Sequence, residues 1–254
     1  WDYLISQNHF SSDVFKSAFA FDKTMLEIGY PRNDILFTGN NAEFILEQKK
    51  KMGLPLDKKI LLYAPTWRDN EYYAKGAYKF NNAMDFDLLR EKLGDEYVCI
   101  VKYHYLVREN RDWSAYKDFV YKFDMYEDIA ELYLVADMLI TDYSSVMFDY
   151  SILKRPMLFF TYDLEEYKDN LRGFYFDFLK EAPGPIIRTT QGLIESILKI
   201  KEDEFKEDEF KEDEFGEKYK AFHDKYNHAD DGNASKKVVE LIENIISGKQ
   251  SQQN

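Results

Sequence analysis

Two adjacent serines, Ser144 and Ser145, stand in a polar turn of the segment 139–160, LITDYSSVMFDYSILKRPMLFF. The pattern predicts a buried strand ending near Thr141, a short helix and a second buried strand. A helix N-terminus offers unpaired backbone N–H groups and a partial positive charge, both of which favour phosphate. The two hydroxyls, with Asp142 to orient them, therefore predict a site for an anionic, nucleotide-linked ligand. The alternative is that Asp142 or Ser144 only caps the helix.

Two further segments place polar side chains directly after predicted strands. His104 ends the run YVCIVKYH, and a histidine there can donate a hydrogen bond to a phosphate oxygen or protonate a leaving group. Thr66 and Arg68 follow the run KILLYA, where a guanidinium can fork phosphate oxygens and a hydroxyl can donate. His104 as a structural surface histidine is the alternative. Because ligands of open α/β sheets bind beyond the carboxyl ends of the strands, we expect these side chains to share one crevice.

The elements that would position these residues alternate between strands and helices. Strands are expected at 59–64, 97–102, 119–123, 138–141 and 156–161, and helices at 42–52, 86–93, 126–136 and 191–200. Apolar runs with few polar interruptions are typical of parallel strands covered on both faces. The alternation therefore predicts an α/β fold built on a doubly wound parallel sheet.

The two ends of the chain carry their own patterns. At the start we expect a strand at 3–6, a helix at about 11–27 and a short strand at 35–38. Near the end, Phe215, Tyr219, Phe222 and Tyr226 form a stripe at helical spacing, which predicts a helix packed on the domain. A last amphipathic helix is expected at 235–246, with its apolar residues turned inward. Those residues are Val238, Leu241, Ile242 and Ile245.

Composition excludes several classes of function. The 254 residues carry a formal net charge of −13, which argues against nucleic-acid binding. The single cysteine, Cys99, lies in an apolar run and allows no disulfide within the chain. The four histidines are scattered without ligand spacing, so we expect no metal site and no cofactor. No run of about 18 apolar residues is present to span a membrane.

A five-residue repeat, KEDEF, occurs three times at 201–215. Its phenylalanines are five apart, so each is rotated by roughly 140° from the last on a helix and no single stripe forms. The repeat is typical of a charged, solvated segment. A role as the partner site of a non-catalytic recruitment module is the alternative.

Several stretches together resemble one family. They are APTWR (64–68), KYH (102–104), the block beginning ITDYSS, RGFYFDF (172–178), DGNAS (231–235), and the opening QNHFSSDVFKSAF and GYPRND. In this order they are similar to the CDP-glycerol glycerophosphotransferases, the teichoic acid polymerases and primases of Gram-positive bacteria. The resemblance covers nearly the whole chain except the KEDEF repeat.

The resemblance implies a GT-B architecture and a reaction. Residues 1–40 would end the N-terminal, acceptor-side half, and 41–254 would form the donor-nucleotide-binding half. The implied reaction transfers glycerol phosphate from CDP-glycerol to the terminal hydroxyl of a lipid-linked poly(glycerol phosphate) chain and releases CMP. His104 would be the catalytic histidine at the pyrophosphate, gripped also by Ser144 and Ser145. Thr66, Arg68 and Asp142 match donor-side positions.

One departure from the family pattern concerns the acceptor. The family has a second histidine in a WHG-type motif, which activates the acceptor hydroxyl, and no such motif occurs here. We therefore expect a fragment that binds donor and turns over poorly. The resemblance also implies a cytoplasmic protein, peripheral on the inner face of the membrane through regions outside this chain. A related transferase using CDP-ribitol or a nucleotide sugar is the enzymatic alternative.

Overall fold

The computed structural model describes residues 1–68, 72–74, 77–78, 83–104, 107, 111–167, 173–202 and 214–248. Within these ranges the largest element is a six-stranded parallel sheet in the order β10-β9-β8-β3-β6-β7. Its strands are β3 (Lys59–Tyr63), β6 (Tyr97–Val101), β7 (Val120–Lys122), β8 (Met138–Thr141), β9 (Met157–Phe160) and β10 (Ile186–Ile187). The predicted α/β fold with a doubly wound parallel sheet is confirmed.

The direction of winding reverses in the middle of this sheet. From β3 the chain proceeds outward through β6 to β7, then returns to β8 on the other side of β3 and continues to β9 and β10. The switch point therefore lies between β3 and β8. Open α/β sheets bind ligands beyond the carboxyl ends of the strands at such a point, so the loops that follow β3 and β8 stand where a ligand is expected.

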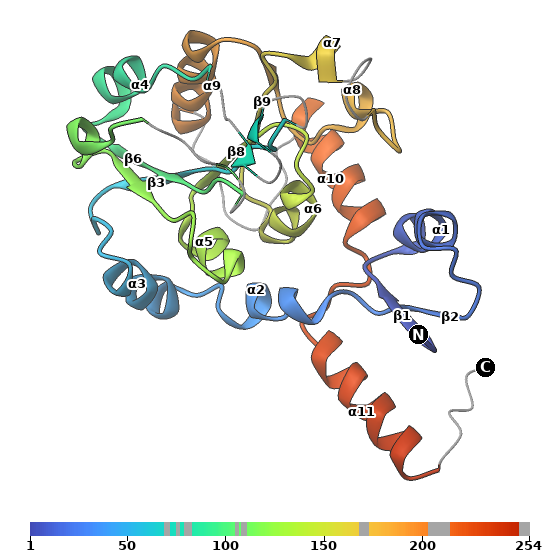
Figure 1. Ribbon diagram of the computed structural model, residues 1–254. Coiled ribbons are helices and arrows are strands. Elements are labelled where there is room, and N and C mark those ends of the chain that lie inside the picture. The colour runs from blue at the N-terminus through green and yellow to red at the C-terminus, as the bar shows by residue number, and fades with distance from the viewer. Residues whose placement is uncertain are drawn as a thin grey trace.

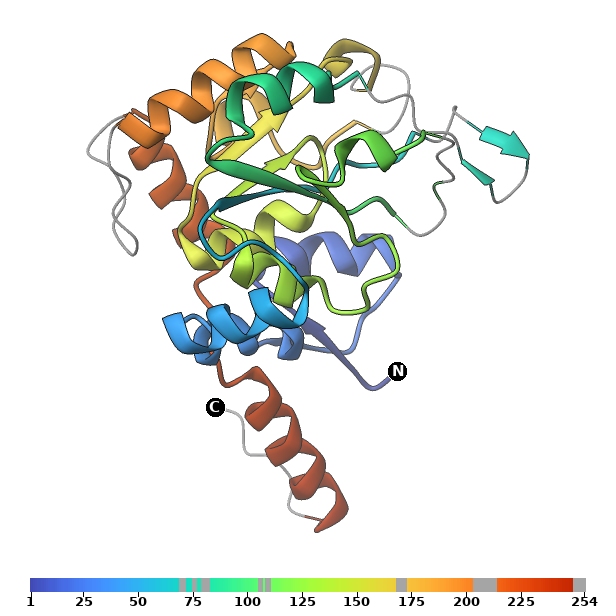
Figure 2. The same cartoon turned by 90° about the vertical axis from the view of Figure 1, so that its left-hand side faces the viewer.

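Helices cover both faces of the sheet (Figures 1 and 2). One face carries α4 (Phe86–Leu93) and α9 (Thr190–Glu202), and the other carries α3 (Ala42–Lys51), α5 (Ile129–Val135), α6 (Val146–Tyr150), the 3-10 turn η3 (Ser151–Leu153) and α10 (Glu214–Tyr226). The helix α5 begins later than its pattern predicts because the Asp128 side chain accepts the N–H of Ala130 and caps it there.

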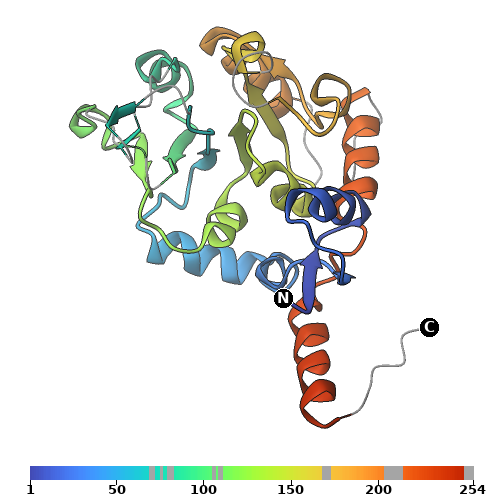
Figure 3. The same ribbon diagram turned by 45° about the vertical axis from the view of Figure 1, so that its right-hand side comes forward.

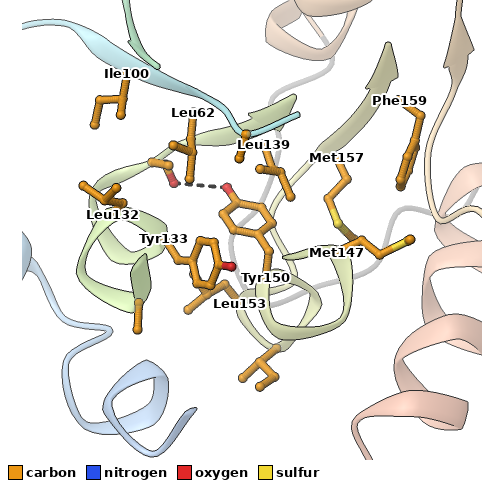
Figure 4. Packing of buried hydrophobic residues seen from close by; sticks show 14 of the residues in the cluster. Leu62, Ile100, Leu132, Tyr133, Leu139, Met147, Tyr150, Leu153, Met157 and Phe159 are labelled. Carbon is orange, nitrogen blue, oxygen red and sulfur yellow. Dashed lines mark hydrogen bonds between the residues drawn. The ribbon is translucent and has the colours of Figure 1, made fainter. Parts of the chain in front are cut away.

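The core on the α5–α6 side shows how the helices are fastened to the sheet (Figure 4). Leu62 and Leu139 project from neighbouring strands toward Tyr133 of α5 and Tyr150 of α6. The Tyr150 hydroxyl donates to the carbonyl oxygen of Ala136 at 3.2 Å, so the deeply buried ring keeps a partner for its polar atom. The helix that directly follows the candidate serines is thus held against the central strands.

The first 27 residues form a separate small unit. The strands β1 (Tyr3–Ser6) and β2 (Thr24–Glu27) pair in parallel, with α1 (His9–Ala18) between them. The predicted helix at 11–27 is therefore wrong in both limits. Asn8 caps the helix earlier, and Ala20 adopts a left-handed backbone (φ 48°) that ends it. Residues 24–27 become a strand because β1 is available to pair with them, which is a tertiary effect.

A second correction concerns 35–38. This short apolar run forms α2 (Ile35–Thr38), continuing from the 3-10 turn η1 (Pro31–Asn33), and not a strand. Periodicity cannot separate a strand from a helix over four apolar residues. The remaining short elements are β4 (Tyr72–Ala74), β5 (Ala77–Tyr78), η2 (Ser114–Tyr116), α7 (Leu164–Glu166) and α8 (Phe178–Glu181).

The two C-terminal helices behave differently from each other. In α10, Tyr219, Phe222 and Tyr226 are buried, as their spacing predicts; the side chain of Phe215 and residues 203–213 of the KEDEF repeat lie outside the described residues. The helix α11 (Ala234–Ile246) projects away from the sheet (Figures 1 and 3). Ile242 and Ile245 are about half exposed, so the prediction of an inward apolar face is wrong for them.

A polar junction joins the small unit, α6 and the start of α11. Arg32 and Asn33 donate to the Asp149 carboxylate, and Gln7 and the Tyr30 N–H donate to Asp230. The carboxylate of Asp34 accepts the first two N–H groups of α11, at 2.9 and 2.7 Å, and so caps that helix from a distant part of the chain. No described helix is long and apolar enough to cross a membrane.

Candidate functional site

The candidate site is built on the carboxyl ends of β3 and β8, which are neighbours in the sheet. Ala64 donates its N–H to the carbonyl oxygen of Ile140, and the Thr141 hydroxyl donates to the carbonyl oxygen of Ala64 at 2.8 Å. These bonds hold the two strand ends together just before each chain turns into its loop. The loop after β3 carries Thr66 and Arg68, and the loop after β8 carries Asp142 and the serine pair.

Asp142 joins the two loops from a fully buried position. One carboxylate oxygen accepts the backbone N–H of Thr66 at 2.8 Å and that of Tyr143 at 2.6 Å, while the other accepts from Nη1 of Arg68 at 3.0 Å. Burial raises the pKa of Asp142, and Arg68 and Thr66 oppose that shift. The carboxylate thus works as an internal acceptor that shapes both loops.

Arg68 is equally buried and extends the network to a third loop. Its Nε and Nη2 donate to the two oxygens of Asp163, at 2.6 and 3.0 Å, in a bidentate pair. Its Nη1 also donates to the carbonyl oxygen of Thr66 at 2.6 Å. Burial disfavours the charged guanidinium, but Asp142 and Asp163 outweigh that effect and raise the pKa of Arg68. Asp163 follows β9, so three consecutive strand ends are tied together.

Aromatic rings enclose this cluster. The rings of Tyr143, Tyr162 and Tyr167 have their centroids 5.2 to 5.6 Å from the guanidinium carbon of Arg68. The Tyr143 ring stacks on that of Tyr167 with centroids 3.9 Å apart, and its hydroxyl donates to Asp163 at 3.0 Å. The rings separate the charged groups from water, which strengthens the ion pairs relative to surface pairs.

His104 reaches the site from the other side of β3, beyond the end of β6. Its imidazole is exposed and lies against the indole of Trp67, with ring centroids 4.2 Å apart. Trp67 stands between Thr66 and Arg68 in the chain, so the loop after β3 contacts the candidate histidine directly. An exposed imidazole at this end of the sheet is accessible to a ligand and able to donate or transfer a proton.

The two serines lie at the start of α6, as predicted. Ser145 is exposed and makes no side-chain cap bond to this helix, and the Ser144 oxygen accepts the N–H of Val146 only at a long 3.5 Å. The prediction that Asp142 or Ser144 only caps this helix thus finds little geometric support: Asp142 bonds the N–H groups of Thr66 and Tyr143. Both hydroxyls have capacity left for a ligand.

The Thr66 hydroxyl is a further unusual feature. Its oxygen is buried and makes no hydrogen bond of ordinary geometry within the described part of the chain, but the hydroxyl lies close enough to Asp142 to lower the pKa of that carboxyl. The role of Thr66 as a donor to a ligand stays a prediction.

The structure therefore brings five predicted residues, Thr66, Arg68, Asp142, Ser144 and Ser145, to two adjacent loops, and connects His104 to them through Trp67. The sequence pattern missed Asp163, although it follows the predicted strand at 156–161 as a polar residue. Asking which acidic residues follow strands, and not only which match a motif, would have found it. Among the described residues no three His, Cys, Asp or Glu side chains gather to hold a metal ion.

Comparison with known proteins agrees with these motifs. A family model described as CDP-Glycerol:Poly(glycerophosphate) glycerophosphotransferase matches residues 1–244. A teichoic acid poly(glycerol phosphate) polymerase of Bacillus subtilis (strain 168) is 52% identical over 242 residues, which are 95% of this chain and 31% of that protein.

Solved structures agree in fold as well. The wall teichoic acid polymerase TagF, a GT-B transferase, superimposes with a TM-score of 0.85 at 43% identity, over 99% of this chain and 60% of that chain. A variant of TagF soaked with CDPG gives a TM-score of 0.82 at 40% identity, over 99% of this chain and 59% of that chain. The chain thus spans less than two thirds of the length of these relatives. It belongs to the CDP-glycerol:poly(glycerophosphate) glycerophosphotransferase family.

Proposed function

We propose that this chain forms the donor-binding part of an enzyme that transfers glycerol phosphate from CDP-glycerol to the terminal hydroxyl of a poly(glycerol phosphate) teichoic acid chain. The observation that carries the proposal is that Ser144 and Ser145, Thr66 and His104 follow the carboxyl ends of the adjacent strands β8, β3 and β6, beside the switch point of the sheet. The first two loops are joined by Asp142, and Trp67 lies against His104. The relative soaked with CDPG supports the same donor.

Each residue has a role that fits this chemistry. The acceptor hydroxyl attacks the β-phosphorus, the bond from that phosphorus to the bridging oxygen breaks, and CMP leaves. The hydroxyls of Ser144, Ser145 and Thr66 hold the pyrophosphate. His104 stabilises the charge that develops on the leaving group or protonates it. Direct contact of Arg68 and Asp142 with the donor stays a prediction.

The division into two halves is part of the proposal. Residues 1–40 would end an acceptor-side half, and 41–254 would form the donor half with its C-terminal helices. Two features support this division: β1 and β2 form a sheet of their own, and α11 leaves Ile242 and Ile245 about half exposed. For the whole protein we propose a lipid-linked acceptor and a peripheral position on the inner face of the cell membrane.

Thermal unfolding in the presence of nucleotides tests the donor. CDP-glycerol should raise the unfolding temperature of this chain, CDP should raise it less, and UDP-N-acetylglucosamine should leave it unchanged, because only a ligand of the folded state stabilises it. CDP-ribitol in a parallel titration separates the two polyol donors. The effect of CDP-glycerol should fall in His104→Ala.

The matched control is His9→Ala. His9 is also an exposed histidine, but it lies on α1 and pairs with Glu27 and Asp13 of the small unit, away from the strand ends. It should keep the full response to CDP-glycerol. If no cytidine nucleotide shifts the transition of the unmodified chain, the proposed donor is wrong.

A further inference from the structure

One guanidinium connects three loops that leave adjacent strands. Arg68 belongs to the loop after β3, and its bonds reach Asp142 after β8 and Asp163 after β9. The three side chains are covered by protein: Arg68 is about 1% exposed, and the carboxylate side chains of Asp142 and Asp163 are 2% and 18% exposed. Bidentate geometry at Asp163 and a single bond at Asp142 fix both the distance and the orientation of the loops.

The bonds also use most of the hydrogen-bonding capacity of Arg68. Thr66, Asp142 and Asp163 together accept four bonds from the five N–H groups of the guanidinium. One N–H group is left, so Arg68 has no bidentate fork to offer a phosphate while these bonds persist.

The cluster of Arg68, Asp142 and Asp163 holds the two loops that carry the candidate site residues. Trp67 lies between Thr66 and Arg68, whose backbone and side chain are both fixed, and its indole contacts the imidazole of His104. On the other side, Asp142 lies two residues before Ser144 and accepts the N–H of Tyr143. Movement of the guanidinium would therefore displace His104 and the serines relative to each other.

We propose that Arg68 is a positioning residue of the donor site: locked between Asp142 and Asp163, it holds Trp67 against His104 and sets the loop of Ser144 and Ser145. The proposal rests on the proposed function only where it names the donor. The contact between Trp67 and His104 belongs to the free protein and is measured without any nucleotide.

The first experiment uses the fluorescence of Trp67. A protonated imidazole in contact with an indole quenches its emission, so a pH titration of the free chain should show a step that is absent in His104→Ala. In Arg68→Lys that step should be lost, because an ammonium keeps the charge but cannot form the fork to Asp163. Arg188→Lys is the control: Arg188 also pairs with a carboxylate, Glu165, but at the surface. It should keep the step.

The second experiment measures CDP-glycerol binding by calorimetry in Asp163→Asn, which keeps Arg68 and removes one of its charged partners. If Arg68 positions the site, the dissociation constant should rise roughly tenfold, as expected for loss of a charge-assisted bond that orders the site. If Arg68 binds the phosphates directly, freeing it should leave the affinity unchanged or improve it, and the proposal fails. Arg188→Lys should bind as the unmodified chain does.

The two experiments separate the two claims. A fluorescence step that persists in folded Arg68→Lys overturns the positioning role, whatever the donor. A chain that shows the step and loses it in Arg68→Lys, but binds no CDP-glycerol, contradicts the proposed function and leaves the positioning role standing. Circular dichroism checks the fold of each variant. If Arg68→Lys does not fold, the step is followed in Asp163→Asn, where it should weaken for the same reason.

Discussion

Two regions of this molecule pair arginine with aspartate, and they differ in depth. At the carboxyl ends of the strands, the side chain of Arg68 is 2% exposed and lies between Asp142 and Asp163. At the junction of the small unit with the sheet, the side chain of Arg32 is 58% exposed and pairs with Asp149. The residue types are the same, but in the second region water solvates the cation.

The difference teaches what each pair can do. A buried ion pair is costly to break, since removing one partner leaves an uncompensated charge and costs about 3–5 kcal/mol. A pair between exposed groups contributes about 0–1 kcal/mol. The Arg32 pair is closer to this case, because its cation is exposed, although the Asp149 side chain is only 9% exposed. The Arg68 cluster therefore imposes one arrangement on its loops, whereas the Arg32 pair fastens two surfaces that other contacts already hold. A single geometry is what the proposed donor site requires.

The largest expected effect is the difference in unfolding free energy between two variants, each of which lacks one of the two arginines. Arg68→Met leaves Asp142 and Asp163 without their cation and should lower the free energy of unfolding by about 3–5 kcal/mol. Arg32→Met should lower it by about 1 kcal/mol or less, because Asn33 still donates to Asp149. Urea denaturation of both variants measures the difference. Equal losses would mean that burial does not distinguish the two regions.

The rate of chemical labelling of Cys99 should differ between the two arginine variants in the same direction as their stability. Cys99 lies in β6, and burial raises the pKa of its thiol to about 12, so a thiol reagent at neutral pH reaches it only when the sheet opens. Arg68→Met should speed the labelling by roughly a hundredfold to several thousandfold, the factor that a loss of about 3–5 kcal/mol corresponds to. Arg32→Met should label at nearly the rate of the unmodified chain. Fast labelling of the unmodified chain would contradict the buried position of Cys99.

The unfolding free energy measured against pH should reveal the contribution of Asp230, a buried carboxyl of the polar junction. Burial raises the pKa of Asp230 above the usual range of an aspartate, and the hydrogen bonds from Gln7, Tyr30 and Asn33 oppose that shift. A raised folded pKa contributes stability below the unfolded value, and that contribution is lost as the pH rises through the folded value. Asp230→Asn should therefore show a smaller loss of unfolding free energy as the pH rises from the usual pKa of an aspartate. If the unfolding free energy changes with pH equally in Asp230→Asn and in the unmodified chain, the raised pKa of Asp230 is wrong.

The smallest effect should come from the cap of α11. Asp34→Ala removes the acceptor of the Ala234 and Ser235 N–H groups and should cost about 1 kcal/mol, confined to this helix. Hydrogen exchange should speed up in the first turn of α11 and stay unchanged in β3 and β6. Asp22→Ala, at an exposed carboxylate outside the helices, is the control. Faster exchange throughout the sheet would show that α11 is coupled to the core.

Local pattern was sufficient where an element is decided by its own residues. The strand at Met138–Thr141 and the helix at Phe86–Leu93 have the predicted limits, because an uninterrupted apolar run and an Asp85 cap specify them locally. The strand β2 could not be found in this way, since it exists by pairing with β1. For α11 the pattern identified a helix, but amphipathicity does not say what covers the apolar face.

For the candidate site, too, the sequence predicted what local pattern decides and missed what depends on tertiary contacts. Its motif residues share one edge because strand ends of a parallel sheet converge there, which the sequence pattern implies. The partners of those residues were not predictable, because pairing of Arg68 with Asp163 depends on how the loops after β3 and β9 fold toward each other. The contact of Trp67 with His104 likewise comes from two loops on separate strands.

Phosphorus NMR of CDP-glycerol titrated with this chain tests the central claim most directly. If the strand ends hold the pyrophosphate, both phosphorus resonances should broaden and shift in proportion to the bound fraction, and Ser144→Ala together with Ser145→Ala should remove most of the change. Ser114→Ala, in the exposed turn η2, should leave the change intact. Resonances that do not respond to the unmodified chain, or respond equally in the double variant, would contradict the assignment of the donor site.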